Sequence, residues 1–197
     1  MDGGSTDKTL EKVQHKISDF SHEVNLLMAT RGRAAQMNEG ALKAHGNVLL
    51  FLHVDCFIPI DSLRLIEEEI LDELTVGGGF KQAFLGSDMF LKVVSLFGNL
   101  RSELTKTFFG DYGIFIRKDV FQEIGGYSNI SFLEDVEICK KARKYGRLVR
   151  IDQYVFTSPR RYLNKGRIKV TIMFVLACLF NLVELRPRFL MKYIVNR

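Results

Sequence analysis

A histidine and an aspartate follow a strongly apolar run near the start of the chain's second quarter. Residues 48–55 read VLLFLHVD, which predicts a buried strand that ends in His53 and Asp55. Ligands of open α/β sheets bind outside the carboxyl ends of the strands, and a carboxylate there can hold a divalent cation against a phosphate. Alternatively, Asp55 caps the turn into Pro59 and His53 has only a structural role. This stretch alone does not separate the two interpretations.

One glutamate and one aspartate lie in the first turn of a predicted helix over residues 133–145. Glu134 and Asp135 are adjacent in its first turn, and the last turn is basic. Successive helical residues point about 100° apart, so the two acids cannot both face one reacting atom. One of them could serve as a general base. The alternative is that both acids only complement the helix dipole.

Two segments near the amino terminus have residues that bind anions. Residues 2–7 read DGGSTD and precede a helical apolar spacing, so backbone amides at the helix start could attract an anion. Arg31 and Arg33 follow a predicted short strand, residues 24–29, where a guanidinium could meet a phosphate. An ordinary glycine turn and a solvated helix start would explain the same residues.

The elements that must position these groups alternate between helices and strands. Three consecutive glycines at 77–79 indicate that another group comes close to the backbone, and a ligand is one candidate for that group. In the helix that follows Asp61, the pattern places Leu63, Ile66 and Ile70 inward. The remaining periodicities predict helices over 34–44, 89–108 and 119–124 and strands over 76–84, 114–117, 148–151 and 154–157.

The carboxyl-terminal part contains a strongly apolar helix, predicted over residues 168–185, with basic residues on both sides. The apolar run is shorter than the about 20 residues that a spanning helix needs. We therefore expect this helix to dock on the core or to lie at a membrane interface.

Composition indicates one globular domain over residues 1–197. The formal net charge of +5 suits an anionic ligand, but no basic stripe interleaved with aromatics indicates a nucleic-acid partner. Three separated cysteines indicate reduced thiols and a cytoplasmic protein, and the first residues do not form a signal peptide.

Together these segments resemble glycosyltransferase family 2, the inverting nucleotide-sugar transferases of GT-A fold. The resemblance is strongest to small bacterial transferases associated with radical-SAM and selenoprotein-domain neighbourhoods. It rests on DGGSTD, residues 32–55, GDYG at 110–113 and residues 133–149. It implies an α/β fold, a three-layer α/β/α sandwich with a mostly parallel sheet. For the location of the enzyme we expect the cytoplasm, with the apolar helix leaving a peripheral position at the inner membrane face as an alternative.

The resemblance also implies roles for individual residues. Asp55 matches the metal-binding position, and His53 stands at the first position of the family's Asp-x-Asp motif. Mg²⁺ or Mn²⁺ is the cofactor expected there. Asp135 matches the catalytic base.

The remaining matches concern the donor, a nucleotide-diphosphate sugar. Asp2 matches the aspartate that contacts the base or ribose, and Arg161 lies near the place of a downstream basic motif. With Arg31, Arg33 and Asp55, these residues are expected to bind the nucleotide sugar. The acceptor is not indicated.

The chain departs from the family pattern ahead of DGGSTD, where family members carry a first strand, a helix and most of a second strand. We therefore expect an amino-terminally truncated GT-A domain. One alternative is a catalytically dead remnant that acts as a binding or membrane-associated module. Another is a nucleotidyltransferase, which would release pyrophosphate instead of a nucleoside diphosphate.

Overall fold

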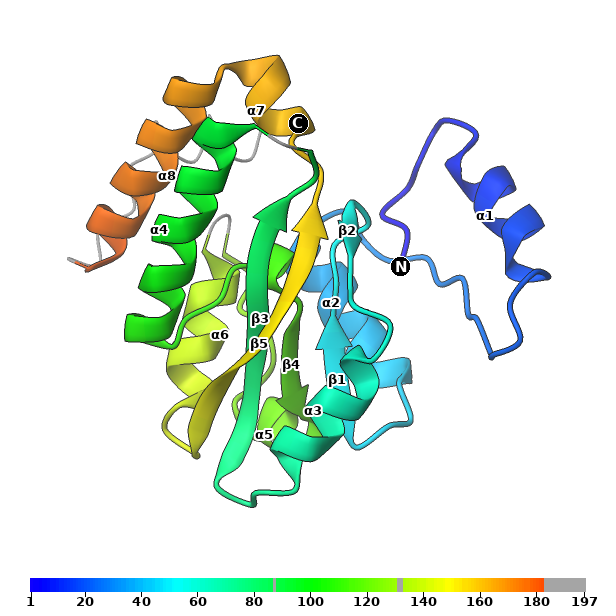
Figure 1. Ribbon diagram of the computed structural model, residues 1–197. Helices are drawn as coiled ribbons and strands as arrows, with labels where there is room; N and C mark the ends of the chain where they lie inside the picture. Colours follow the sequence, from blue (N-terminus) through cyan, green and yellow to red (C-terminus); the bar gives the residue numbers. More distant parts are fainter. Residues whose placement is uncertain (87, 131–132, 183–197) are drawn as a thin grey trace.

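A twisted sheet with helices on both faces organises the chain, as seen in the computed structural model, which describes residues 1–86, 88–130 and 133–182 (Figure 1). In this part of the chain the sheet has five strands. Their order is β1 (Val48–Phe51), β4 (Ile114–Arg117), β3 (Thr75–Phe84), β5 (Arg147–Thr157) and β2 (Cys56–Phe57).

The sheet is mixed, which corrects the expectation of a mostly parallel one. β3 and β5 run parallel, whereas β4 pairs antiparallel with both β1 and β3, and β2 pairs antiparallel with β5. β4 runs opposite to β1: its first residue, Ile114, pairs with Phe51, the last residue of β1. The two predicted strands 148–151 and 154–157 form one strand, β5, with an irregularity between Ile151 and Tyr154.

The predicted helices are confirmed, with boundaries shifted by a few residues, but Leu63 is exposed where the sequence placed it inward. The helices are α1 (Thr9–Ile17), α2 (Arg33–Lys43), α3 (Ser62–Ile70), α4 (Met89–Thr105), α5 (Lys118–Glu123), α6 (Glu134–Ala142), α7 (Arg160–Lys165) and α8 (Arg167–Leu182), with a 3₁₀ turn η1 (Gly110–Tyr112).

Two apolar clusters produce the three layers that the resemblance implied. One cluster joins one face of the sheet to α2, α5 and α6, with Phe108 and Ile138 among its fully buried members. The other joins the opposite face to α3 through Ile66, Phe80 and Phe115. Because both faces are covered, the strands are apolar on both sides.

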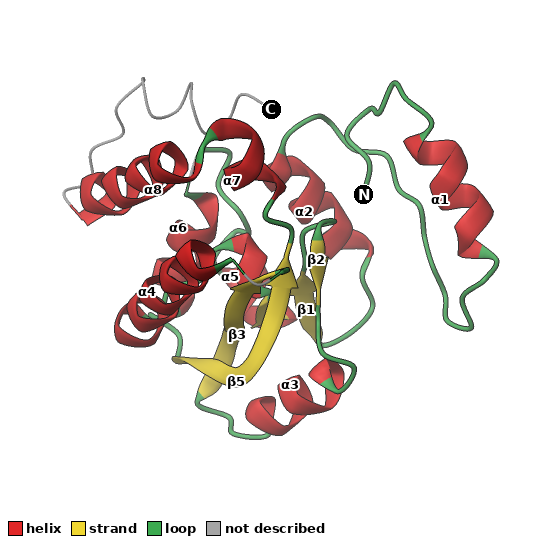
Figure 2. Ribbon diagram, turned by 45° about the horizontal axis from the view of Figure 1, so that its top comes forward, coloured by secondary structure: helices red, strands yellow, loops and turns green. Residues whose placement is uncertain are grey.

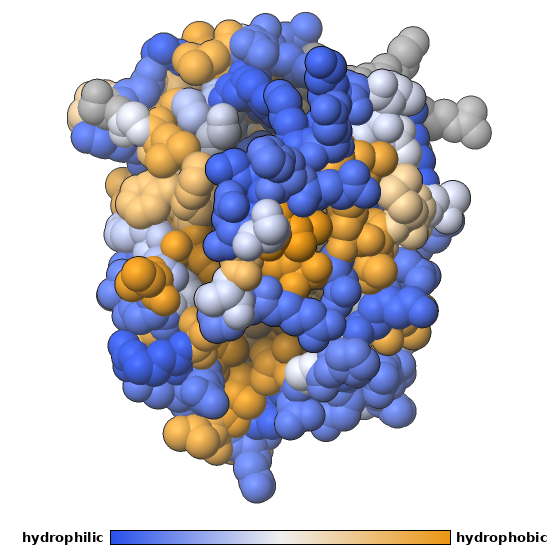
Figure 3. Space-filling model, turned by 90° about the vertical axis from the view of Figure 1, so that its right-hand side faces the viewer, coloured by the Kyte–Doolittle hydropathy of each residue, from blue (hydrophilic) through white to orange (hydrophobic). Residues whose placement is uncertain are grey.

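β1 shows this two-sided pattern in four residues. Leu49 and Phe51 contact the first cluster, whereas Val48 and Leu50 contact the second. The strand ends at Phe51 and not at residue 54, so His53 and Asp55 lie in the turn that follows. Among the described strands β1 pairs with β4 alone, at the sheet edge. Figure 3 faces this side of the molecule and shows an apolar area within a mainly hydrophilic surface.

The predicted strand at residues 24–29 does not form. Only Met28 makes an isolated parallel bridge with Asp2, where the Asp2 N–H donates to the Leu27 carbonyl and the Ala29 N–H donates to the Asp2 carbonyl, both at 2.8 Å. A strand needs a partner along its whole length, and Asp2 offers two backbone hydrogen bonds. The adjoining helix α1 buries no residue and stands apart from the sheet (Figure 1).

The glycines at 77–79 fit closely against protein and not against a ligand site. A Cβ on Gly77 would meet the Phe115 carbonyl, one on Gly78 would meet the Val149 carbonyl, and one on Gly79 would meet the Phe108 ring. Glycine is therefore required where β3 passes between its two neighbouring strands.

Helix α4 turns its polar side chains inward. Its buried residues are Leu91, Ser95, Asn99 and Ser102, whereas Met89, Val93, Leu96, Phe97, Leu100 and Leu104 are exposed. Asn99 fixes the helix to β3, because its Oδ1 accepts from the Gln82 N–H at 2.8 Å and its Nδ2 donates to the Gln82 carbonyl at 2.9 Å. Burial of α4 thus rests on hydrogen bonds, which reverses the usual amphipathic arrangement.

Helix α8 packs beside α4 and α7, as both ribbon views show (Figures 1 and 2). Val170 and Phe174 join Leu91 and Tyr162 in a small apolar cluster. This contact agrees with the core-docked alternative, although residues 183–185 of the predicted helix lie outside the described residues. Within the described residues, no helix has the length and apolar character needed to cross a membrane.

The hydrogen bonds of Asn99 predict an unequal response to substitution along α4. Asn99→Ala leaves the buried N–H and carbonyl of Gln82 without partners, so we expect the free energy of unfolding to fall by about 1–3 kcal/mol. Leu100→Ala, one residue away and exposed, should change it by less than about 0.5 kcal/mol. Urea denaturation of both variants tests this, and equal losses would contradict the role given to Asn99.

Candidate active site

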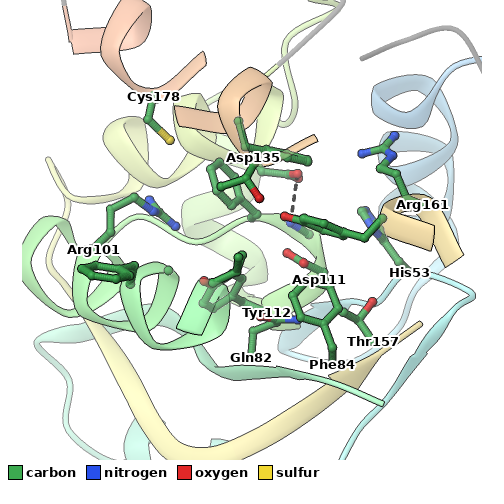
Figure 4. A pocket seen from close by; sticks show the side chains of 18 of the residues that line it. His53, Gln82, Phe84, Arg101, Asp111, Tyr112, Asp135, Thr157, Arg161 and Cys178 are labelled. Atoms are coloured by element: carbon green, nitrogen blue, oxygen red, sulfur yellow. Dashed lines mark hydrogen bonds between the residues drawn. The ribbon is translucent and has the colours of Figure 1, made fainter. Parts of the chain in front are cut away.

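A cavity of about 400 Å³ opens at the end of the sheet where β1, β3 and β5 finish. His53 and Asp55 reach it from the turn after β1, Phe84 from the end of β3 and Thr157 from the end of β5. The sequence predicted a ligand site outside the carboxyl ends of the strands, and the cavity lies there. Figure 4 shows Asp111 and Asp135 in its middle, contributed by η1 and α6.

Asp135 is held at the cavity by one backbone hydrogen bond. Its Oδ2 accepts from the Gly110 N–H at 2.9 Å, whereas its buried Oδ1 has no hydrogen-bond partner among the described residues. Leu133, just before α6, adopts the left-handed conformation with φ of 60°. Such a conformation costs a leucine about 1–2 kcal/mol and marks a turn that the surroundings enforce. Here it starts the helix so that Asp135 lines the cavity.

Burial changes the acidity of Asp135. Its pKa is raised to about 7, mainly by loss of solvation and next by the neighbouring charge of Glu134, whereas Arg33 and the Gly110 N–H lower it in part. A carboxyl group with a pKa near neutrality is suited to accept and release a proton at physiological pH. The free Oδ1 is the atom available for that transfer.

Asp111 is a second carboxyl group in the cavity, partly buried, and the sequence analysis gave it no role. Burial raises its pKa to about 6, and the charge of Asp55 adds to this rise. The carboxylates of Asp111 and Asp55 therefore interact electrostatically within the cavity. The GDYG segment contains Asp111, so the motif itself was the signal that could have identified this residue.

His53 lies tightly against η1. Its imidazole occupies the space that a Cβ on Gly110 would need, which explains glycine at that position. The same glycine donates the N–H that holds Asp135, so His53, Gly110 and Asp135 depend on one another.

The protein oxygens near Asp55 could hold a hard cation only if a bound substrate supplied further oxygen ligands. The described residues include no group of three or more His, Cys, Asp or Glu side chains that could hold a metal ion. Asp55 and Asp111 nevertheless offer carboxylate oxygens to the same cavity. Mg²⁺ and Mn²⁺ sites of this kind use one or two carboxylates and complete their coordination with substrate phosphates. The residues present fit such an arrangement.

Glu134 and Asp135 have separate environments, as the sequence analysis expected for adjacent helical residues. Glu134 is buried and pairs with Arg33, whose Nη2 lies 2.5 Å from its Oε1. Arg33 therefore lines the cavity with its charge opposed by Glu134. The Arg33 side chain is 38% exposed but that of Glu134 only 2%, so loss of Arg33 would leave the buried Glu134 charge without its partner at the start of α6.

The other residues predicted to bind the donor are divided between the cavity and the surface. Arg161 lines the cavity from α7, with its guanidinium 5.7 Å from the centre of the Phe174 ring. Asp2 and Arg31 do not line it. Asp2 folds back on its own loop, where its carboxylate accepts from the N–H groups of Gly4 and Ser5 at 2.8 Å. These bonds lower the pKa of Asp2, with the Ser5 hydroxyl as the largest cause.

Comparison with known proteins relates this arrangement to one family. The family model "Glycosyltransferase like family 2" matches residues 1–74. No curated protein sequence matches the chain.

Solved structures with the same fold include two nucleotide-sugar complexes. Mannosyltransferase PcManGT from Pyrobaculum calidifontis, in complex with GDP-Man and Mn²⁺, is 18% identical with a TM-score of 0.62 and covers 79% of this chain and 45% of its own. S. aureus TarS 1-349 with UDP-GlcNAc is 18% identical with a TM-score of 0.55, covering 80% and 48%.

A second structure of S. aureus TarS 1-349 is 16% identical with a TM-score of 0.55 and covers 91% of this chain and 55% of its own. The chain thus spans about half the length of these proteins. It has the GT-A fold, and its residues 1–74 match glycosyltransferase family 2, as the sequence resemblance implied.

Proposed function

We propose that this chain is the catalytic domain of an inverting, metal-assisted glycosyltransferase that moves a sugar from a nucleotide-diphosphate sugar to a hydroxyl acceptor. The observation that carries the proposal is Asp135: a buried carboxylate with a raised pKa, one oxygen held by Gly110 and the other free in a cavity. The family match and the nucleotide-sugar complexes of the structural neighbours support the same reaction.

The proposed mechanism gives Asp135 the role of general base and places the diphosphate near Asp55 and Arg161. The acceptor hydroxyl lies against Asp135 Oδ1, which takes its proton as the hydroxyl oxygen bonds to the anomeric carbon. The bond from that carbon to the diphosphate breaks on the opposite side, which inverts the configuration. Mg²⁺ or Mn²⁺, held by Asp55 with Asp111 and His53 nearby, would neutralise the charge of the leaving diphosphate. Arg161 is placed to bind the same diphosphate.

Membrane contact remains a part of this proposal. α4 and α8 both expose apolar side chains, and Lys165, Arg167 and Lys169 lie near the start of α8. Apolar burial and attraction to anionic lipid act together in peripheral association. A cytoplasmic enzyme at the inner membrane face would use both.

The first prediction concerns Asp135. Asp135→Asn keeps an acceptor for the Gly110 N–H but cannot take a proton, so kcat should fall by about 10²- to 10⁴-fold while donor binding persists. Glu137→Gln is a matched control, because Glu137 lies in the same helical turn but outside the cavity lining. Turnover of GDP-Man or UDP-GlcNAc would be measured as nucleoside diphosphate release.

Glu134→Gln separates structural from catalytic acids on α6. It removes the partner of Arg33, so stability should fall while kcat stays within a few-fold of the parent value. If Asp135→Asn keeps near-normal kcat, the assignment of the base is wrong. A parent protein that binds donor without turnover would favour the non-catalytic binding module.

The second prediction concerns pH. Because the base must be ionised, kcat should rise with pH and level off above about 7, the pKa of Asp135. Stability should respond in the opposite sense. The folded pKa lies above the ordinary value of 3.8, so this contribution to stability is complete below pH 4 and is lost as pH rises through 7.

Asp135→Asn removes that ionisation and should gain stability relative to the parent protein between pH 4 and pH 8, by about 1–3 kcal/mol. Asp111, with a pKa of about 6, preserves part of the parent slope in the variant. Urea denaturation at both pH values measures the difference. A constant difference between the two proteins would contradict the buried ionisable role of Asp135.

The third prediction concerns Asp55. Asp55→Asn removes a hard anionic ligand, so binding of Mn²⁺ and of GDP should weaken together, by about tenfold or more in calorimetric titrations. Asp61→Asn is the control, because Asp61 is a surface aspartate paired with Arg64 outside the cavity. GDP binding that is unchanged by Asp55→Asn and by EDTA would overturn the metal-assisted part of the proposal.

A further inference from the structure

The cavity has a second end that the proposed sugar transfer leaves unexplained. Figure 4 shows His53 and Arg161 on one side of the central carboxylates, with Arg101 and Cys178 on the other. On the Arg101 side the cavity continues between α4 and α8. Its wall there is made by apolar side chains, namely Val94, Phe97, Phe109, Phe174, Val175 and Leu179.

Arg101 is a cation inside this apolar end. Its guanidinium lies 4.2 Å from the centre of the Phe109 ring, and Nη1 donates to the Thr107 hydroxyl at 2.9 Å. Nε and Nη2 are buried and make no hydrogen bond of ordinary geometry within the described residues, although the Tyr112 hydroxyl lies close enough to interact with the guanidinium. Leaving charged donors buried and unpaired costs more than most single contacts contribute, so the site is suited to receive an anion.

The nearest acidic group does not satisfy Arg101. Arg101 lowers the pKa of Asp111, which places the two charges within electrostatic range. No ion pair between Arg101 and Asp111 is present in the described structure, and Nε and Nη2 of Arg101 make no hydrogen bond to the carboxylate of Asp111. An anion on a ligand can therefore approach the two open nitrogens of Arg101 from the cavity.

The outer surfaces of α4 and α8 are apolar where the cavity opens between them. α4 presents Val93, Leu96 and Leu100 to the exterior, and α8 presents Ile168, Ile172, Val175 and Leu179. Each set recurs at helical spacing and forms a stripe along its helix. Three of the four buried residues of α4 are polar, so most of the apolar side chains of this helix lie on its exposed side and not in the core. The α8 stripe reaches the cavity at Val175 and Leu179, which also line it, and an apolar chain can enter there.

We propose that the acceptor is a hydroxyl-bearing anionic lipid. Its apolar chain lies between α4 and α8, its anionic group binds Arg101, and a hydroxyl of its head group reaches Asp135. This inference rests on the proposed glycosyltransferase function and names its acceptor class. In the transfer, the head-group oxygen bonds to the anomeric carbon, the hydroxyl proton goes to Asp135, and the nucleoside diphosphate leaves with the electrons of the broken bond.

Calorimetric binding without donor tests the acceptor site alone. The probes, kept below their critical micelle concentrations, are lauroyl lysophosphatidylglycerol, monolaurin, which lacks the phosphate, and glycerol phosphate, which lacks the chain. The complete lipid should bind at least about tenfold more tightly than either partial probe, because charge-assisted hydrogen bonds and apolar burial act together.

Two pairs of variants locate the two contacts. Arg101→Gln should weaken the complete lipid about tenfold and leave monolaurin unchanged, whereas Lys92→Gln, which removes an exposed charge on α4, should leave both unchanged. Val175→Asp should weaken both chain-bearing probes. Ile172→Asp is its matched control, because both side chains are 52% exposed on α8 but only Val175 lines the cavity.

The proposal is overturned if monolaurin binds as tightly as the complete lipid, or if Arg101→Gln binds both probes like the parent protein. It is also overturned if Ile172→Asp and Val175→Asp weaken binding equally, since that would indicate unspecific adsorption to the stripes. Thermal melting of each variant checks that it is folded. Because no donor is present, these results are independent of donor turnover, whose absence would instead count against the proposed function.

Discussion

The hydrogen bond from the Gly110 N–H to Asp135 connects two segments that are far apart in the chain and is the contact on which the candidate site depends. A buried carboxylate is costly, and one backbone donor offsets only part of its lost solvation. The carboxyl group consequently keeps a pKa near neutrality, with one oxygen open to the cavity. The same arrangement requires Leu133 to adopt a strained left-handed conformation and requires a glycine at position 110, where His53 leaves no room for a Cβ.

Helix α4 shows how the fold separates stability from surface character. Its attachment to β3 uses the paired hydrogen bonds of Asn99 and Gln82, supplemented by the Ser95 hydroxyl, which donates to Gln82 Oε1 at 3.1 Å. Hydrogen bonds of this kind are directional and fix the helix in rotation as well as position. The apolar side of α4 therefore remains outside, beside α8, and Arg101 is directed toward the cavity between them.

Local patterns were sufficient for much of the fold and for part of the site. The strand 114–117 and helix α2 follow from apolar periodicity and flanking glycines, and the cavity lies beyond the apolar run that ends in Asp55. The strand expected at 24–29 failed because strand formation depends on a partner that sequence pattern alone does not supply. Leu63 was placed inward by spacing, yet the sheet covers only part of that face of α3.

The residues that pattern analysis overlooked are those whose role arises from long-range packing. Asp111 follows a glycine in a short turn, and Arg101 is one of several polar residues of α4, so neither has a local signature. Only the meeting of η1, α4 and α6 makes them neighbours of Asp135 in one cavity. The GDYG match pointed to the segment but carried no physical reason for its aspartate, which burial beside Asp55 supplies.

The charges in the cavity constrain the order in which ligands can bind productively. Burial raises the pKa values of Asp111 and Asp135, and acidic neighbours add to the rise: Asp55 acts on Asp111, and Glu134 and Asp111 act on Asp135. A diphosphate brought among these side chains without a compensating cation would raise both pKa values further and protonate Asp135, the proposed base. Arg161 supplies one positive charge on that side. A divalent cation arriving with the diphosphate would supply the rest, so the proposed donor binding would be thermodynamically coupled to the ionisation of Asp135 at neutral pH.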